Sequence, residues 1–413
     1  MQGNKKIDFY NTEGRFRRNL TKIDSWCKTE SNKKSINKLL NWAQARDISY
    51  ARRVKYLFFL KYVVEWLDKD LDKVDKDDII YVVGKINGNG FCAETKRNFK
   101  SALKKFYDVI LYDENKALID WLYDRRNDIF KAKNEGLRRE KTKLTKQDIA
   151  KMIGNSNVRM KAYISTLFES CCRPSEILAC RISDLQPTKY GFKLNVPQSK
   201  TNPRSIPLIE SCQYLQQWLS MHPNNKPDGF LFCTDAINNN GELWSPEGAG
   251  KQLRIVAKKA GINKRVTNYS FRSSGFTYKS TVKKISTSSM ELLMGWSRGS
   301  FSQRAKDYDL NTEEDAKNEV MQAYGKEVDD DIVDMEMKKC LRCGEENGFA
   351  EQYCKKCASP LDPKIIAQIE MKQVMYEKLW EKLVGCVDFG KLGKDKNRIE
   401  KEMVEMMGVF GKR

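Results

Sequence analysis

The spacing of apolar residues constrains the fold of this chain most strongly. From Ser35 onward, apolar side chains recur mainly at every third or fourth position, which is the period of a helix with one buried face. The alternation typical of a strand appears around residues 192–196 and 206–208, on either side of a turn that contains Asn202-Pro203. The sequence therefore predicts a mainly α-helical protein with a small β-sheet.

A chain of 413 residues is too long for one ordinary core, so we expect several domains. Composition shifts and breakers give the boundaries. They predict a basic N-terminal arm (1–34), a helical domain (35–130), a polar linker (131–143), an α+β domain (144–326), an acidic linker (327–337), a cysteine-rich module (338–361) and C-terminal helices (362–413). The C-terminal helices either make subunit contacts or pack on each other.

The charge of the chain favours a polyanionic partner. There are 75 Lys and Arg residues against 55 Asp and Glu, a formal net charge of +20, and each phosphate contact releases counterions. A merely soluble basic protein is the alternative. The fourth predicted helix surrounds an apolar stripe with cations, so it is either a DNA-backbone contact or a solvated face. The candidate DNA-contacting residues are Lys96, Arg97, Lys100, Lys104, Lys105 and Arg204; the last is a phosphate contact or a solvent-exposed residue.

A cysteine cluster predicts one structural Zn²⁺. Cys340-x2-Cys343 and Cys354-x2-Cys357 are separated by ten residues, and each pair suits a zinc knuckle. Four thiolates complete a tetrahedron and leave no open position, so no catalytic metal is expected at this site. Four unliganded thiols are the alternative.

Composition also bears on location. The remaining cysteines stand mostly among apolar neighbours, as buried free thiols do, which favours a reducing intracellular compartment. No run of 18 apolar residues occurs, and the N-terminus lacks the apolar core of a signal peptide. We expect a cytoplasmic, nucleoid-associated protein with no membrane partner.

Five short motifs occur in a particular order, and two arginines, a lysine and a tyrosine are what metal-free attack on a phosphodiester needs. They are Arg173-Pro174-Ser175-Glu176, Ser199-Lys200-Thr201, Tyr269-Ser270-Phe271-Arg272, Met294-Gly295-Trp296 and Tyr308. In this order they resemble the motifs of the tyrosine recombinase (phage integrase) family, over residues 36 to 310. Two features depart from the family pattern: Tyr269 replaces the usual histidine, and Trp296 lies twelve positions before Tyr308, a longer gap than is common.

The resemblance implies roles that fit the chemistry of each side chain. Arg173 and Arg272 would contact the non-bridging phosphate oxygens, because a guanidinium gives bidentate contacts and stays charged. Tyr308 would be the nucleophile, and Lys200 would donate a proton to the leaving 5′-oxygen. Tyr269 and Trp296 would be supporting donors. Glu176 would orient Arg173 or cap its helix.

The resemblance also implies an architecture and partners. A SAM-like core-binding domain and an α+β catalytic domain would form a clamp around double-stranded DNA. A homotetramer would act on two DNA sites, with a possible accessory DNA-bending protein and without ATP. The zinc ribbon resembles that of integrases of archaeal or mobile-element origin. Two alternatives remain open: a catalytically silent DNA-binding protein on the same scaffold, and a topoisomerase that relaxes supercoils.

Overall fold

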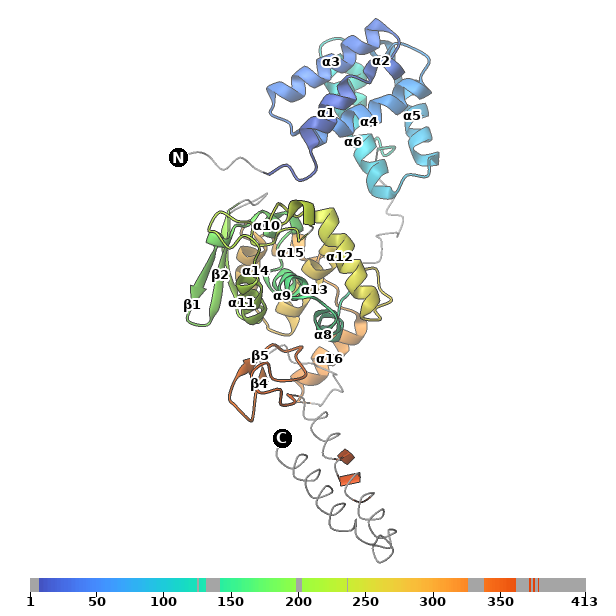
Figure 1. The fold of residues 1–413 in the computed structure, drawn as a ribbon. Helices are drawn as coiled ribbons and strands as arrows, with labels where there is room; N and C mark the ends of the chain where they lie inside the picture. The colour runs from blue at the N-terminus through green and yellow to red at the C-terminus, as the bar shows by residue number, and fades with distance from the viewer. Residues whose placement is uncertain are drawn as a thin grey trace, which may run out of the picture.

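The computed structural model describes residues 7–124, 126–130, 142–197, 203–235, 237–325 and 338–361, with residues 371, 372, 374, 375 and 378. Figure 1 shows a helical bundle, a second and larger helical body with a small sheet at one edge, and a two-stranded unit beside it. The structure thus confirms the mainly α-helical fold with small sheets. In these ranges no helix is apolar over a length that would cross a bilayer.

The first body is a helical bundle built around α6. Its helices are α1 (Thr12–Leu20), α2 (Ile23–Trp26), α3 (Glu30–Ala45), α4 (Tyr50–Trp66), α5 (Lys76–Gly88), α6 (Ala93–Leu111) and α7 (Lys116–Tyr123), with a 3-10 turn η1 (Leu71–Lys73). Helix α6 contacts α3, α4, α5 and α7. Its apolar stripe is fully buried at Phe99 and Phe106, and Phe99 stacks on Phe59 of α4 with ring centroids 4.5 Å apart.

The N-terminal arm expected over residues 1–34 is largely helical, which corrects that expectation. Helix α1 packs along α4, where Phe16 is buried with its ring centroid 5.5 Å from that of Tyr50. Helix α3 begins at Glu30, five residues before the predicted start. The sequence concealed α1 because a helix that buries one large apolar residue shows no repeated period.

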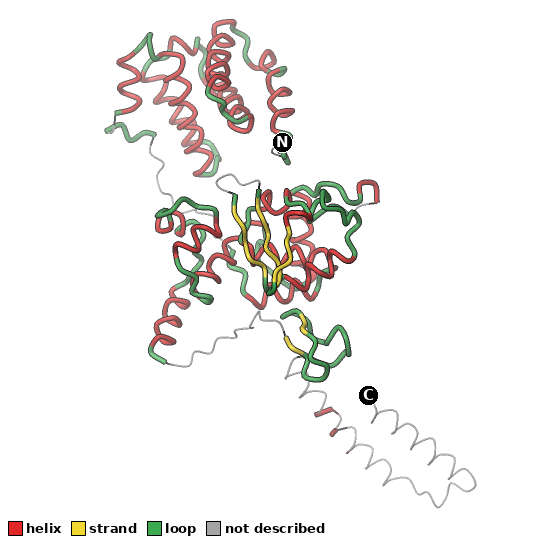
Figure 2. Tube along the Cα trace, turned by 90° about the vertical axis from the view of Figure 1, so that its left-hand side faces the viewer, coloured by secondary structure: helices red, strands yellow, loops and turns green. Residues whose placement is uncertain are grey.

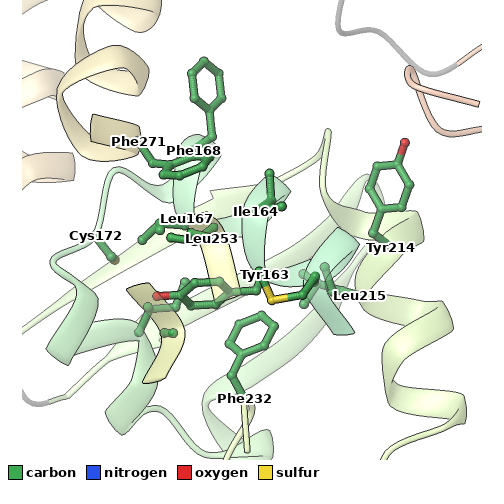
Figure 3. Packing of buried hydrophobic residues seen from close by; sticks show 14 of the residues in the cluster. Tyr163, Ile164, Leu167, Phe168, Cys172, Tyr214, Leu215, Phe232, Leu253 and Phe271 are labelled. Carbon is green, nitrogen blue, oxygen red and sulfur yellow. The ribbon is translucent and has the colours of Figure 1, made fainter. Parts of the chain in front are cut away.

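The second body packs around a central helix, α9. Its helices are α8 (Lys146–Gly154), α9 (Val158–Ser170), α10 (Pro174–Ala179), α11 (Cys212–Ser220), α12 (Pro246–Lys259), α13 (Asn268–Thr281), α14 (Thr287–Met294), α15 (Phe301–Ala305) and α16 (Glu313–Ala323), with 3-10 turns η2 (Ile182–Asp184) and η3 (Ile237–Asn239). Every α9 side chain from residue 159 to 170 except that of Lys161 is buried. Figure 3 shows Tyr163 and Leu167 of α9 among apolar side chains from α11, α12 and α13.

The sheet confirms the predicted hairpin and adds a strand. Strands β1 (Leu185–Thr188), β2 (Gly191–Val196) and β3 (Arg204–Leu208) are antiparallel in the order β1-β2-β3, side by side in Figure 2. Leu194 lies opposite Ile206 and both are fully buried, as the alternation predicted. Strand β1 was not predicted because only its first residue is buried. Lys200 lies outside the described residues.

The cysteine-rich module docks on the second body. Strands β4 (Lys338–Lys339) and β5 (Glu346–Asn347) form its two-stranded sheet. Phe349 is 1% exposed and belongs to the same core as α9; its ring meets that of Tyr214 edge-on at 6.0 Å. Lys161 of α9 and Glu351 form an ion pair of 2.9 Å. The module and the second body therefore share a core. The expected linkers, except residues 142 and 143, and nearly all of 362–413 lie outside the described residues.

Candidate active site

The end of α9 presents Arg173 and its partner Glu176. Cys171 ends α9 in the left-handed conformation, with φ of 52°, and turns the chain. Pro174 then opens α10, a position that suits proline because its missing N–H would be unbonded there anyway. Glu176 accepts the backbone N–H of Arg173 at 2.9 Å and its guanidinium at 2.7 Å. Glu176 therefore caps the helix and orients the arginine at the same time.

Arg204 meets the same carboxylate from the sheet. Its Nη2 lies 2.8 Å from Glu176, and its Nε donates to the carbonyl of Leu293, near the end of α14, at 2.7 Å. The side chain is 6% exposed. The expectation of a solvent-exposed Arg204 is therefore wrong, and its burial gives no support to a direct DNA contact. Polar neighbours in the sequence suggested an exposed side chain. Arg204 is buried because it pairs with the buried carboxylate of Glu176, and the sequence alone does not reveal this contact.

Glu176 is held as a carboxylate. Burial opposes its ionisation, but the hydrogen bond and charge of Arg204, together with those of Arg173, outweigh this and lower its pKa to about 2. The negatively charged carboxylate of Glu176 therefore lies between the guanidinium groups of Arg173 and Arg204.

Arg272 of α13 ties two segments of the site together. It is fully buried, and its Nη1 donates to the carbonyl of Cys171 while its Nη2 donates to that of Met294 at 3.2 Å. Its Nε has no hydrogen-bond partner among the described residues. One turn later Gly275 lets α13 approach α9 closely, because a Cβ there would lie 2.2 Å from the carbonyl oxygen of Phe168.

Tyr308 lies against Arg272. The guanidinium carbon of Arg272 is 5.0 Å from the centroid of the Tyr308 ring, a cation–π distance. The ring centroid of Trp296 is 5.4 Å from that of Tyr308. The short helix α15 takes up the longer chain between these two residues, so the unusual spacing still brings them into contact.

Glu291 is a site residue that the sequence analysis missed. Its buried carboxylate accepts the backbone N–H groups of Gly299 at 2.9 Å and Phe301 at 2.7 Å, and so fixes the loop between Trp296 and α15. An acidic residue within the otherwise apolar run from 290 to 294 was the signal that could have identified it.

The structure thus brings some of the predicted site residues into contact and leaves others apart or undescribed. Arg272, Trp296 and Tyr308 are linked by direct contacts, and Arg173 joins them through the turn that begins at Cys171. Tyr269 begins the same turn of α13 as Arg272 but is 57% exposed. The structure does not describe Lys200. The single histidine, His222, is buried beside Trp218, and one ring nitrogen lies 3.0 Å from the carbonyl oxygen of Phe230.

The basic residues of α6 make contacts within the first body. Lys100 was expected on an open surface, but it is only 5% exposed, and its Nζ donates to the carbonyl of Ile129. Lys105 pairs with Asp108. The remaining three contact a carbonyl, a carboxylate or aromatic rings. A groove of about 310 Å³ is lined by cations and aromatic rings from α4, α6, α7 and the segment after α7: Arg52, Tyr56, Arg97, Lys100, Lys104, Lys105, Tyr123 and Phe130.

The four cysteines of the docked module fit a tetrahedral metal ion. Cys340 and Cys357 have sulfur atoms 3.6 Å apart, Cys343 and Cys354 have theirs 3.5 Å apart, and all four sulfurs lie within 4.8 Å of one another. Thiolates about 2.3 Å from a tetrahedral Zn²⁺ would be roughly 3.8 Å apart. These cysteines could therefore hold one zinc ion with no open position.

Comparison with known proteins agrees with this site. Residues 142–305 match the family model described as the phage integrase family. Among curated proteins, the chain is 23% identical over 238 residues to tyrosine recombinase XerD of Listeria monocytogenes, covering 53% of this chain and 75% of that protein. It is 27% identical over 135 residues to XerD of Oceanobacillus iheyensis, covering 31% of this chain and 43% of that protein.

Solved structures share the fold at low identity. A λ integrase dimer bound to a core site matches with a TM-score of 0.54 and 16% identity, over 71% of this chain and 86% of that one. XerH recombinase bound to a palindromic difH substrate matches with a TM-score of 0.52 and 17% identity, over 78% and 98%. The Tn1549 transposon integrase matches with a TM-score of 0.51 and 17% identity, over 70% and 99%.

The family match and a site that groups two arginine-bearing segments around a tyrosine both support one class of protein, the DNA breaking-rejoining recombinases. Residues 142–305 are thus similar to the phage integrase family, and the curated relatives that this chain matches are named tyrosine recombinases.

Proposed function

We propose that this chain is a site-specific tyrosine recombinase or integrase that cleaves and rejoins double-stranded DNA through Tyr308. The observation that carries the proposal is the contact between Tyr308 and Arg272, in a site where Arg272 also holds the turn before Arg173. A tyrosine beside fixed guanidinium groups is the arrangement that a metal-free attack on a phosphodiester requires.

The proposed cleavage exchanges one phosphate ester for another. Tyr308 gives up its phenol proton to water as its oxygen attacks phosphorus; a bond forms to the 3′-phosphate, and the bond from phosphorus to the 5′-oxygen breaks. The 5′-oxygen leaves with the bonding electrons and takes a proton from Lys200, while Arg173 and Arg272 stabilise charge on the non-bridging oxygens. Attack by a 5′-hydroxyl reverses the step, so rejoining needs no ATP and no catalytic metal.

The position of Arg272 requires the site to open before it reacts. Its guanidinium is fully buried with the ring of Tyr308 beside it, and its Nε–H is unpaired among the described residues. A DNA phosphate that entered between arginine and ring would satisfy this donor. Tyr269, which is exposed, can reach an entering phosphate, whereas Trp296 is 6% exposed and supports Tyr308 mainly by packing.

The proposed partners follow from charge and relatives. The λ integrase and XerH structures contain DNA, and a net charge of +20 favours the same partner here. We place the DNA contacts on the groove of the first body and on the surface around Tyr308, which is partly buried. A homotetramer on two DNA sites, an accessory DNA-bending protein, one structural zinc ion and a cytoplasmic, nucleoid-associated location belong to the same proposal.

A catalytically silent DNA-binding protein is the second candidate, because Tyr269 stands where the family has histidine. DNA with a nick beside the scissile phosphate distinguishes the recombinase from the silent protein. The short fragment that carries the 5′-hydroxyl diffuses away after cleavage, so the reaction cannot reverse and any covalent adduct accumulates. The proposal predicts an adduct with the wild type and none with Tyr308→Phe, which should bind DNA equally well. Binding without an adduct in the wild type would favour the silent protein, and relaxation of a supercoiled plasmid lacking a recombination site would favour a topoisomerase.

A further inference from the structure

We propose that Arg204 is a positioning residue for DNA cleavage, which acts by bracing Glu176 and the end of α14. This inference rests on the proposed recombinase function. Arg204 would not touch the DNA; it would hold in place the segments that do.

The contacts of Arg204 join three separate parts of the site. Its Nη2 is 2.8 Å from Glu176, which in turn orients Arg173. Its Nε donates at 2.7 Å to the carbonyl of Leu293, three residues before Trp296. Arg204 itself is the first residue of β3, four residues after Lys200. One buried side chain therefore links the strands and both helical segments that carry the proposed machinery.

Stability alone is a weak reason for this arrangement. Both charged side chains are almost completely buried, at 6% exposure for Arg204 and 2% for Glu176, and removing charges from water is costly. Buried ion pairs can often be replaced by apolar residues without loss of stability, so such a pair is better explained by the geometry it enforces. The guanidinium also donates in two directions at once, toward a carboxylate and toward a carbonyl, which a lysine ammonium on a flexible stem does less well.

A double-mutant cycle tests this role. The variants are Arg204→Met, Arg204→Lys, Glu176→Gln and the Arg204→Met/Glu176→Gln pair, measured by single-turnover adduct formation on nicked DNA, by DNA affinity and by thermal unfolding. Arg181→Met is the matched control, because the Arg181 guanidinium also donates to a backbone carbonyl, that of Asp228 at 2.7 Å, but has no contact with Glu176 among those described.

We expect Arg204→Met to slow cleavage about 100-fold while DNA affinity changes less than about twofold, because misplaced catalytic groups lower the rate and not the binding. Arg204→Lys should recover about tenfold of that loss. The double variant should be within about threefold of the slower single variant, since the two residues act as one unit. Arg181→Met should cleave at the wild-type rate.

Three results would overturn the inference: cleavage by Arg204→Met within about threefold of wild type, equal rates for the Lys and Met variants, or losses that multiply in the double variant. If Arg204→Met does not fold, Arg204→Lys decides, since cleavage at the wild-type rate would show that the two-way contact is dispensable. A wild type that forms no adduct would instead refute the recombinase function itself.

Discussion

Glu176 is the residue that holds Arg173 and Arg204 in position. It accepts hydrogen bonds from Arg173 and Arg204, and their charges keep its pKa at about 2 despite burial. A carboxyl group whose pKa is lower in the folded protein stabilises the fold above the pKa of the unfolded chain, 4.5 for glutamate, and loses this contribution as the pH falls toward 2.

Replacing Glu176 by Gln should therefore have a pH-dependent effect on stability. Near pH 7 we expect the free energy of unfolding of the second body to fall by about 3 kcal/mol, because the buried guanidinium of Arg204 and the partly buried one of Arg173 lose their counter-charge. The difference from wild type should shrink as the pH falls from about 4.5 toward 2, where the wild-type carboxylate becomes protonated. Chemical denaturation across this pH range measures it.

The exposed Glu314→Gln variant of α16 is the control and should follow the wild type at every pH. A Glu176→Gln difference that stays constant between pH 5 and pH 2.5 would contradict the assigned ionisation of Glu176.

At the level of single residues, the sequence predicted the groups that meet but not how they are held. Arg272 and Tyr308 stand in ordered motifs, and the structure places them in contact. The burial of Arg204 and Lys100 was not predictable, because the partners that draw these side chains inward, Glu176 and the carbonyl of Ile129, are 28 and 29 residues away in the chain.

At the level of elements, the packing of α13 on α9 brings the arginines together. Gly275 makes this possible, since a Cβ at this position would lie 2.2 Å from the carbonyl oxygen of Phe168 and 3.0 Å from the sulfur of Cys171. The carbonyl of Cys171 in turn accepts the hydrogen bond from Arg272. Any separation of the two helices should therefore disturb the site directly.

Gly275→Ala should consequently destabilise the protein and slow DNA cleavage. The helices must move apart to admit the methyl group, at a cost of about 3 kcal/mol, and adduct formation should fall more than about tenfold as Arg272 leaves the Cys171 carbonyl. Gly84→Ala is the matched control: Gly84 lies inside α5 with nothing within 4 Å of an added Cβ, so the change should stabilise the protein by up to about 1 kcal/mol. Equal unfolding midpoints for the two variants would contradict the close approach.

The elements themselves were mostly predictable. The apolar period gave the long helices, Pro174 gave the start of α10, and alternation gave β2 and β3. Helix α1 and strand β1 were missed because each buries a single large side chain, which leaves no repeat to detect. Which faces pack together, such as α9 against α13, is set by shape and is not written in the period of either helix.

For the whole molecule, the unforeseen feature is the docking of the cysteine-rich module. The sequence predicted the four zinc ligands from their spacing but treated the module as an appendage. Phe349 instead completes the core of the second body beside Tyr214 of α11, and Glu351 pairs with Lys161 of α9. An aromatic residue five residues before the second cysteine pair carries no sign in the sequence of where it will be buried.

Zinc removal should therefore weaken the second body as well as the module. Chelation should unfold the small module, which depends on its metal, and withdraw Phe349 from its site. Loss of a buried phenylalanine costs about 3–5 kcal/mol, so we expect faster hydrogen exchange in α11 and α9. Phe349→Ala should reproduce the effect with zinc bound, whereas Leu341→Ala, at a position 93% exposed, should not. Unchanged exchange in α11 after chelation would contradict the shared core.

The identity of the residue that becomes linked to DNA tests the central claim most directly. Adduct trapped on nicked DNA can be digested with protease and nuclease, and the nucleotide-bearing peptide located by mass spectrometry. The account predicts a 3′-phosphate on Tyr308, which lies against Arg272. Linkage to Tyr324 or Tyr269, both exposed in this structure, or an adduct that persists in Tyr308→Phe, would contradict it.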